Sequence, residues 1–188
     1  MLPAVALIAT RFPANVRSEP AVHLQSDPSL SVLRPIFMLD DEEVDRVLFA
    51  RLLRDAEVKN PSRIFSRGED LIDAMIAVLR GAPPPLVCFL DVKMPGMNGF
   101  DVLRWIRCQQ ACNDIPVVML SSSTEPRDLN EAHHSGAQCY IPKFPRPDAF
   151  CQILDEAARV AAANSPGPFK LPCNLLLSSA SDALLNER

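Results

Sequence analysis

The chain has 188 residues, of which 48% are apolar, and a formal net charge of -4. That length suits one domain with extensions, and the acidic balance excludes a basic surface for nucleic acid. No apolar run approaches the roughly 18 residues of a membrane span, and the six cysteines show no CxxC spacing, so we expect a cytoplasmic protein without membrane segments or disulfides.

Residues 1–34 carry four prolines and no sustained apolar period, which predicts a poorly ordered N-terminal extension. From residue 35 to residue 162, short apolar runs alternate with segments whose apolar residues recur at helical spacing. Residues 163–188 are too few for a further domain, so we expect a C-terminal tail without an output domain. The predicted strands are 35–39, 62–67, 86–90, 116–120 and 138–143, and the predicted helices are 43–56, 69–80, 100–108, 127–134 and 148–162.

Five strands alternating with five helices predict a doubly wound α/β domain with a parallel sheet covered on both faces, because parallel neighbours need crossover connections. The fifth strand contains Pro142, which cannot donate to a ladder, so we expect this strand at a sheet edge. The first helix carries acids in its first turn, where the helix dipole favours negative charge. Its apolar residues at helical spacing are Val44, Val47, Leu48, Leu52 and Ala56.

The stretch from Leu86 to Phe100 places an acid where ligands bind in such sheets. Five apolar residues run directly into Asp91, and a loop with Pro95 and two glycines separates it from the next helix. Ligands of α/β sheets bind in the crevice outside the carboxyl ends of the strands. Asp91 is therefore a candidate site residue, with capping of the loop or of the next helix as the simpler interpretation.

Two more acids are expected in the same crevice. Asp40 and Asp41 follow the first strand, and three neighbouring carboxylates repel one another unless a cation neutralises them. Oxygen ligands that leave room for water suit Mg²⁺. Ser121 and Lys143 end neighbouring strands, so a hydroxyl and an ammonium would face the acids, an arrangement that suits a phosphoryl group.

These residues lie in four motifs: LDD at 39–41, LDVKMPGMNG at 90–99, VVMLSSS at 117–123 and YIPK at 140–143. In this order and spacing they resemble the response regulator receiver domain of two-component signalling, from residue 35 to about residue 160. The resemblance implies a flavodoxin-like sheet of strand order 2-1-3-4-5, and a signalling protein that assists its own phosphorylation and dephosphorylation rather than an enzyme. By this resemblance Asp91 is the phosphoacceptor.

The resemblance also assigns the surrounding residues. Asp41 directly, and Asp40 through water, would hold Mg²⁺ together with Asp91 and the backbone carbonyl of Lys93. Ser121 and Lys143 would contact the phosphoryl oxygens, and Tyr140 would be the aromatic switch. The partners implied are a sensor histidine kinase or phosphotransfer protein and a downstream protein target, with self-association through the last helix and the edge strand as a further option.

One departure keeps alternatives open. The family usually has a proline directly after its lysine, whereas Phe144 follows Lys143 here, which supports a pseudo-receiver that works without phosphorylation. An aspartate-nucleophile phosphatase is disfavoured, because the residues after Asp40 do not follow its DxDxT signature. Simpler structural interpretations also remain for single residues. Asp40 and Asp41 could be acids that favour the start of a helix, Ser121 a helix cap and Tyr140 a packing residue of the edge strand. His133 and His134 are expected at the surface.

Overall fold

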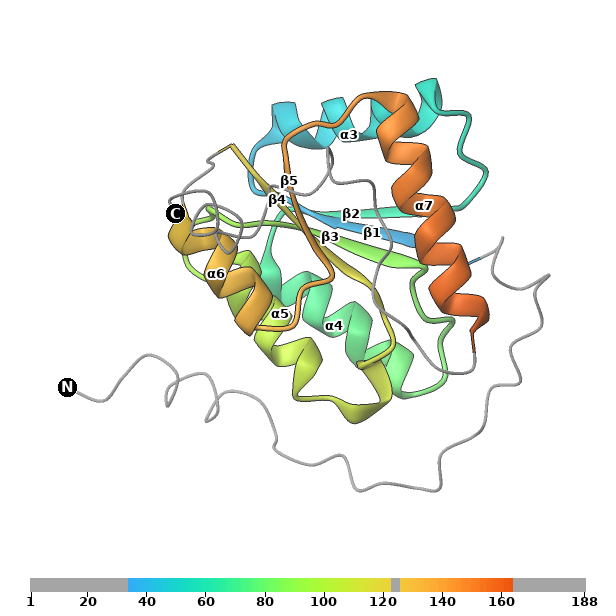
Figure 1. Ribbon diagram of the computed structural model, residues 1–188. Helices are drawn as coiled ribbons and strands as arrows, with labels where there is room; N and C mark the ends of the chain where they lie inside the picture. The colour runs from blue at the N-terminus through green and yellow to red at the C-terminus, as the bar shows by residue number, and fades with distance from the viewer. Residues whose placement is uncertain (1–33, 123–125, 164–188) are drawn as a thin grey trace, which may run out of the picture.

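The computed structural model describes residues 34–122 and 126–163, and these residues form one five-stranded parallel sheet with helices on both faces (Figure 1). The strand order is β2-β1-β3-β4-β5, which confirms the predicted flavodoxin-like topology and the edge position of the fifth strand. The predicted extension of residues 1–34, apart from Arg34, and the predicted tail, apart from Ala163, lie outside the described residues. The strands are β1 (Ile36–Leu39), β2 (Ser62–Phe65), β3 (Val87–Asp91), β4 (Val117–Ser121) and β5 (Cys139–Pro142).

The helices follow the strands in the predicted alternation, with ends that differ from the expectation by one or a few residues. None of those within the described part of the chain has both the length and the apolar character needed to cross a membrane. The helices are α3 (Glu43–Asp55), α4 (Gly68–Leu79), α5 (Gly99–Arg107), α6 (Pro126–His134) and α7 (Pro147–Ala162), with a short 3-10 helix, η1 (Gln110–Cys112).

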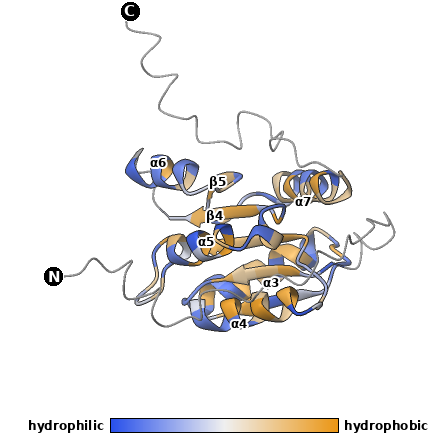
Figure 2. Cartoon of the chain, turned by 90° about the horizontal axis from the view of Figure 1, so that it is seen from below, coloured by the Kyte–Doolittle hydropathy of each residue, from blue (hydrophilic) through white to orange (hydrophobic). Residues whose placement is uncertain are grey.

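Alternation along the strands builds a separate core on each face of the sheet. In β3, Cys88 and Leu90 face the core under α4 and α5, whereas Val87 and Phe89 face the core under α3 and α7. A strand covered on both faces must be apolar throughout, which explains the uninterrupted run before Asp91. Figure 2 shows the contrast between buried and peripheral elements, with a hydrophobic β4 inside the sheet and a mostly hydrophilic α6 at the periphery.

Three phenylalanines join α3 and α7 to the central strand. Phe49 of α3, Phe89 of β3 and Phe150 of α7 have ring centroids 5.3 to 5.7 Å apart and are almost fully buried. Tilted and edge-to-face contacts of this kind add to the stabilisation from burial. They fix the first turns of α3 next to the carboxyl end of β3.

The buried face of α3 differs from the face that the helical spacing suggested. Val44, Val47 and Leu48 are exposed, Val44 and Val47 by 67% and 61%, whereas Phe49, Leu52 and Leu53 pack on the sheet. The helix has apolar residues around most of its circumference, and the phenylalanine cluster decides which side faces the core. An apolar patch of Val44, Val47 and Leu48 therefore remains on the surface.

The cysteines inside the sheet behave as small apolar residues. Cys88 and Cys139 are buried and unbridged, as predicted from their strand-like surroundings. Burial raises the pKa of each thiol to about 12, so neither is ionised near neutral pH.

Candidate functional site

The carboxyl edge of the sheet brings the three predicted acids together. Leu39 of β1 pairs with Leu90 of β3, so the residues that follow them, Asp40 and Asp91, lie side by side at the strand ends. Asp41 comes next in the chain. One carboxylate oxygen from each of these three residues lies within 4.8 Å of the others, and Asp40 and Asp91 are buried.

The turn after β1 is held by its own backbone and by helix α3. The backbone N–H of Glu42 donates to Oδ1 of Asp40 over 2.9 Å. Nη1 of Arg46 donates to the carbonyl oxygens of Asp40 and Asp41 over 2.9 and 2.6 Å. Arg46, in the first turn of α3, therefore helps to orient both acids. The helical pattern of the sequence did not reveal this role.

The ammonium of Lys143 lies among the acids. Its Nζ is 2.7 Å from Oδ2 of Asp40 and 3.1 Å from Oδ1 of Asp91, so the predicted approach of Lys143 to the acid cluster is present. The peptide between Lys143 and Phe144 is cis, and Phe144 packs against the core under α3 and α7. The replacement of the usual proline by Phe144 thus still leaves the lysine directed at Asp91.

A third acid contacts the same ammonium. Oδ2 of Asp45, in the first turn of α3, is 2.7 Å from Nζ of Lys143. The sequence suggested only a helix dipole acid at this position. The contact joins residues 98 positions apart, and no local pattern could have signalled it.

Burial and charge alter the proton affinities of these groups. Burial is the main cause that raises the pKa of Asp91 to about 6, with Lys143 opposing the rise and Asp40 adding to it. Burial likewise raises the pKa of Asp40 against the hydrogen bond from Lys143. Burial alone would lower the pKa of Lys143, but its contacts with Asp40, Asp45 and Asp91 raise it above the usual value, so the lysine stays charged.

Ser121 lies on β4, the strand beside that of Asp91, and Tyr140 lies on β5, the edge strand next to β4. Ser121 is the last residue of β4, it is buried, and its carbonyl oxygen accepts a 2.9 Å hydrogen bond from the backbone N–H of Lys143. This bond joins the ends of β4 and β5, which carry the predicted hydroxyl and ammonium groups. Tyr140 is buried in the core under α4 and α5, three residues before Lys143 on β5.

The loop after β3 is packed closely on Asp91. The backbone N–H of Lys93 lies 3.4 Å from Oδ1 of Asp91, and a Cβ at Gly99 would overlap the carbonyl oxygen of Asp91. Asn98 and Asp101 form a reciprocal capping box at the start of α5. The loop is therefore tied at both ends, by the strand and by the capped helix.

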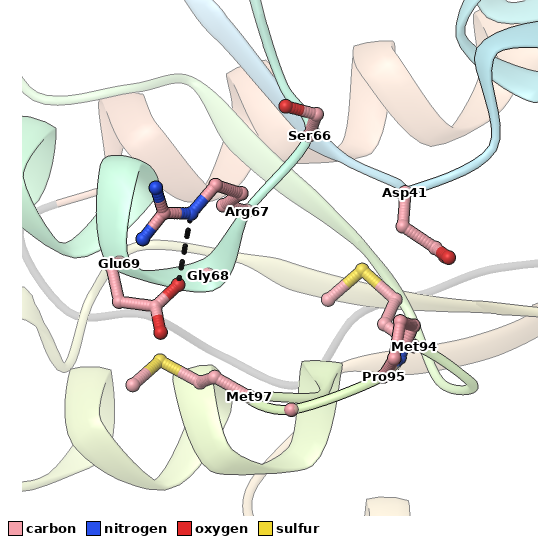
Figure 3. Close-up of a pocket in the computed structure, with 9 residues that line it drawn as sticks. Asp41, Ser66, Arg67, Gly68, Glu69, Met94, Pro95 and Met97 are labelled. Atoms are coloured by element: carbon pink, nitrogen blue, oxygen red, sulfur yellow. Dashed lines mark ion pairs between the residues drawn. The ribbon is translucent and has the colours of Figure 1, made fainter.

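A pocket of about 210 Å³ opens beside the acid cluster. It lies between the start of α4 and the loop after β3, and Figure 3 shows Asp41 on one side with the methionines of the loop nearby. Arg67 and Glu69 form an ion pair of 3.6 Å at its rim. This pocket gives solvent-borne groups a route to Asp41. The residues that line it are Asp41, Ser66, Arg67, Gly68, Glu69, Met94, Pro95, Gly96 and Met97.

The donor set fits a hard divalent cation. Oδ1 of Asp41 is one of the few buried side-chain oxygens in the described segments that lack a hydrogen-bond partner. An unpartnered buried carboxylate oxygen beside two further acids is unfavourable unless a cation is near. Three carboxylates, of which Asp41 lines the pocket, suit a metal that keeps several waters.

The comparison with known families agrees with this geometry. The model of the response regulator receiver domain matches residues 36–155. The chain belongs to this family. Receiver domains are signalling modules of two-component systems, and residues 36–155 form such a module.

Individual relatives place the receiver domain among proteins of different length. It is 31% identical over 130 residues to the sensory/regulatory protein RpfC of Xanthomonas campestris, and this match covers 68% of the chain but 16% of the relative. It is 27% identical to the two-component response regulator ORR6 of Oryza sativa, covering 60% of the chain and 64% of the relative. The chain thus spans less than two thirds of these relatives.

Solved structures support the same fold. The bacteriophytochrome response regulator AtBRR is 27% identical, with a TM-score of 0.60 over 68% of this chain and 94% of that one. The chemotaxis protein CheY4 of Vibrio cholerae is 23% identical, with a TM-score of 0.56 over 66% of this chain and 98% of that one. The receiver domain shares its sheet and helix arrangement with both.

Proposed function

We propose that this receiver domain is a phosphoacceptor response regulator that takes a phosphoryl group onto Asp91 from a phosphohistidine of a histidine kinase or phosphotransfer protein. The observation that carries the proposal is the placement of Asp91: a buried carboxylate at a strand end, 3.1 Å from a lysine and clustered with two further acids. Phosphoryl transfer depends on positioning and charge neutralisation, which these groups supply.

In the proposed step, a carboxylate oxygen of Asp91 forms a bond to phosphorus while the bond from phosphorus to the donor's imidazole nitrogen breaks. The electron pair of that bond stays on the imidazole nitrogen, and one proton, either already on the other ring nitrogen or taken up from solvent, makes the leaving group a neutral imidazole. With a pKa of about 6, Asp91 is mainly ionised at pH 7 and can act as the nucleophile. Mg²⁺, held by Asp40, Asp41, Asp91 and the backbone carbonyl of Lys93, would neutralise the charge of the transferring group. Lys143 and the hydroxyl of Ser121 would contact its oxygens.

The surface around the site supports a protein donor. Val44, Val47 and Leu48 form an exposed apolar patch on α3, within two turns of the acids that follow β1. Exposed apolar patches of this kind mark protein contacts. A phosphohistidine protein bound to this patch would lie next to the carboxyl edge of the sheet.

Signalling would follow from a change of surface. By the resemblance, Tyr140 responds when Ser121 moves toward the phosphoryl group, and the altered surface of α6, β5 and α7 then changes affinity for a downstream protein. Self-association through α7 and β5 and a cytoplasmic location are parts of the same proposal.

The test is phosphorylation with a small donor. We expect acetyl phosphate with Mg²⁺ to label Asp91, and beryllofluoride with Mg²⁺ to change the fluorescence of Trp105, which packs against the core under α4 and α5. Asp91→Asn should abolish both responses, whereas Asp73→Asn, an exposed acid on α4, should keep them. A well-folded wild-type protein that gives neither response would overturn the proposal and favour a pseudo-receiver.

A further inference from the structure

The ammonium of Lys143 has more acidic partners than the proposed chemistry requires. Asp40, Asp45 and Asp91 each place one oxygen within 3.1 Å of Nζ. Among the described residues, the acids close enough to share a cation are Asp40, Asp41 and Asp91, and Asp45 is outside that group. Of the three acids that contact Lys143, Asp45 is thus the one that would not also bind the metal.

The three contacts match the donor capacity of the lysine. An ammonium has three N–H donors, and three carboxylates surround it here. The side chains of Lys143 and Asp45 are only 10% and 17% exposed, so water screens this pair weakly. The position of the lysine tip is therefore set by all three acids together.

Asp45 lies on a well-packed part of α3. It lies one turn before Phe49, which is buried against Phe89 of β3, and next to Arg46, which holds the turn after β1. Lys143 itself is on the segment that follows β5 and has a long, flexible side chain. A carboxylate on a well-packed helix can fix such a side chain at one place.

We propose that Asp45 is a positioning residue that holds the ammonium of Lys143 beside Asp91, so that the lysine meets the incoming phosphoryl group. The proposal deepens the proposed function and rests on it. Because Asp45 is outside the candidate metal group, its contact with Lys143 persists when Asp40 and Asp91 turn to a cation. One N–H of the lysine then stays on Asp45, and the others are available to phosphoryl oxygens.

The test is a double-mutant cycle with acetyl phosphate at saturating Mg²⁺. Asp45→Ala should slow phosphorylation roughly tenfold, the effect of losing one hydrogen bond between charged groups. If Asp45 acts through Lys143, the double variant Asp45→Ala with Lys143→Ala should be no slower than Lys143→Ala alone. Asp45→Glu should restore part of the rate. A full rate for Asp45→Ala, or independent effects in the double variant, would overturn the proposal.

A matched control excludes a general effect of charge on α3. Asp55 is an acid at the other end of the same helix, where it pairs with Arg51 over 3.5 Å and is half exposed. Asp55→Ala removes the same charge far from Lys143, so we expect it to keep the wild-type rate. A loss of rate in this variant equal to that of Asp45→Ala would show that helix charge, and not lysine positioning, is responsible.

A second measurement needs neither metal nor donor. The Lys143 ammonium of the isotope-labelled wild-type chain should give a nitrogen-detected or proton-detected NMR signal protected from solvent exchange, and Asp45→Ala should lose that protection. Unchanged protection would refute the positioning role. A wild-type protein that accepts no phosphoryl group would instead refute the proposed function, and the NMR comparison would still decide whether Asp45 holds Lys143.

Discussion

At the scale of single residues, the ionised carboxylate of Asp91 is electrostatically unfavourable in the folded protein. Burial is the main cause of its raised pKa, because the folded protein solvates the carboxylate less well than water does. Lys143 offsets this effect only in part. As the proposed nucleophile, Asp91 would be poorly stabilised before the reaction, and its neighbours would be arranged for the charge that arrives with the phosphoryl group.

This imbalance predicts a pH-dependent stability change in Asp91→Asn without metal. The pKa of Asp91 is about 6 in the folded chain and about 4 when unfolded, so the folded state binds the proton more tightly. The contribution of Asp91 to stability therefore falls as pH rises from about 4 to about 6. We expect Asp91→Asn to unfold with a free energy about 1–3 kcal/mol higher than wild type at pH 7 in EDTA.

Urea unfolding at several pH values measures this difference. The gain of Asp91→Asn should shrink toward zero as pH is lowered from 6 to 4, where the wild-type carboxyl becomes protonated. Asp73→Asn, exposed on α4, should differ from wild type by less than about 0.5 kcal/mol throughout. A gain that does not vary with pH would show that the effect does not arise from titration of Asp91.

Among single residues, the contacts that the sequence did not predict are those between residues far apart in the chain. Asp40, Asp41 and Asp91 were predictable as one group, since each follows an apolar strand and parallel strands end at one edge. The contact between Asp45 and Lys143 was not, because nothing in the spacing of α3 shows which side of the helix meets the end of β5.

At the scale of elements, the junction between β3 and α5 decides where Asp91 lies. Gly99 begins α5 and packs directly on the backbone of Asp91, so the helix cannot approach the strand this closely with a side chain there. The capping box of Asn98 and Asp101 holds the helix start at this place. The strand end and the helix start therefore form one rigid unit.

Gly99→Ala should disturb both the fold and the site. The new Cβ would overlap the carbonyl oxygen of Asp91, and backbone atoms yield less readily than a flexible side chain. We expect a loss of about 1–3 kcal/mol in the free energy of unfolding and slower labelling by acetyl phosphate.

Gly68→Ala is the matched control for this junction. Gly68 also begins a helix, but its added Cβ would meet the side chain of Met97, which can move. Denaturant unfolding of both variants should show the smaller loss for Gly68→Ala. Equal losses would indicate that helix starts in general, rather than the contact with Asp91, set the cost.

Helix α3 shows why its buried face was not predictable from spacing. Apolar residues at helical spacing can be chosen on two sides of this helix, and the sequence does not say which set meets the sheet. Phe49, Leu52 and Leu53 are buried because Phe49 packs against both Phe89 and Phe150. The other side, with Val44 and Val47, is consequently left at the surface beside the site.

The exposed apolar patch on α3 predicts that a substitution there will slow phosphoryl transfer from a protein donor but not from a small-molecule donor. Val47→Glu keeps helix propensity but adds a charge to the apolar patch, so it should slow transfer from a phosphohistidine protein by about tenfold, as loss of an interface residue does. Transfer from acetyl phosphate should be unchanged. Ala77→Glu, exposed on α4, is the control. A Val47→Glu variant that accepts from both donors at the wild-type rate would place the donor elsewhere.

At the scale of the whole molecule, the acid cluster would connect the proposed metal binding to the stability of the domain. The acids are carried by the ends of β1 and β3, the two neighbouring central strands whose side chains enter both cores. Repulsion among the carboxylates therefore opposes folding of the sheet edge when no cation is present. A cation that binds the folded state alone removes this repulsion and adds its binding free energy to stability.

Mg²⁺ should raise the free energy of unfolding of the wild-type chain, by about 2.7 kcal/mol at a concentration of 100 times its Kd. Asp41→Asn removes the carboxylate whose Oδ1 lacks a hydrogen-bond partner, so this variant should gain far less from the metal. In EDTA the same substitution removes repulsion, and the variant should be as stable as wild type or more so. The two proteins would then exchange their order of stability as Mg²⁺ is added, which urea titrations at several metal concentrations can follow. Equal gains in both proteins would show that the ion binds without Asp41. A variant that was merely poorly folded would instead be less stable than wild type in EDTA as well, so the two cases can be told apart.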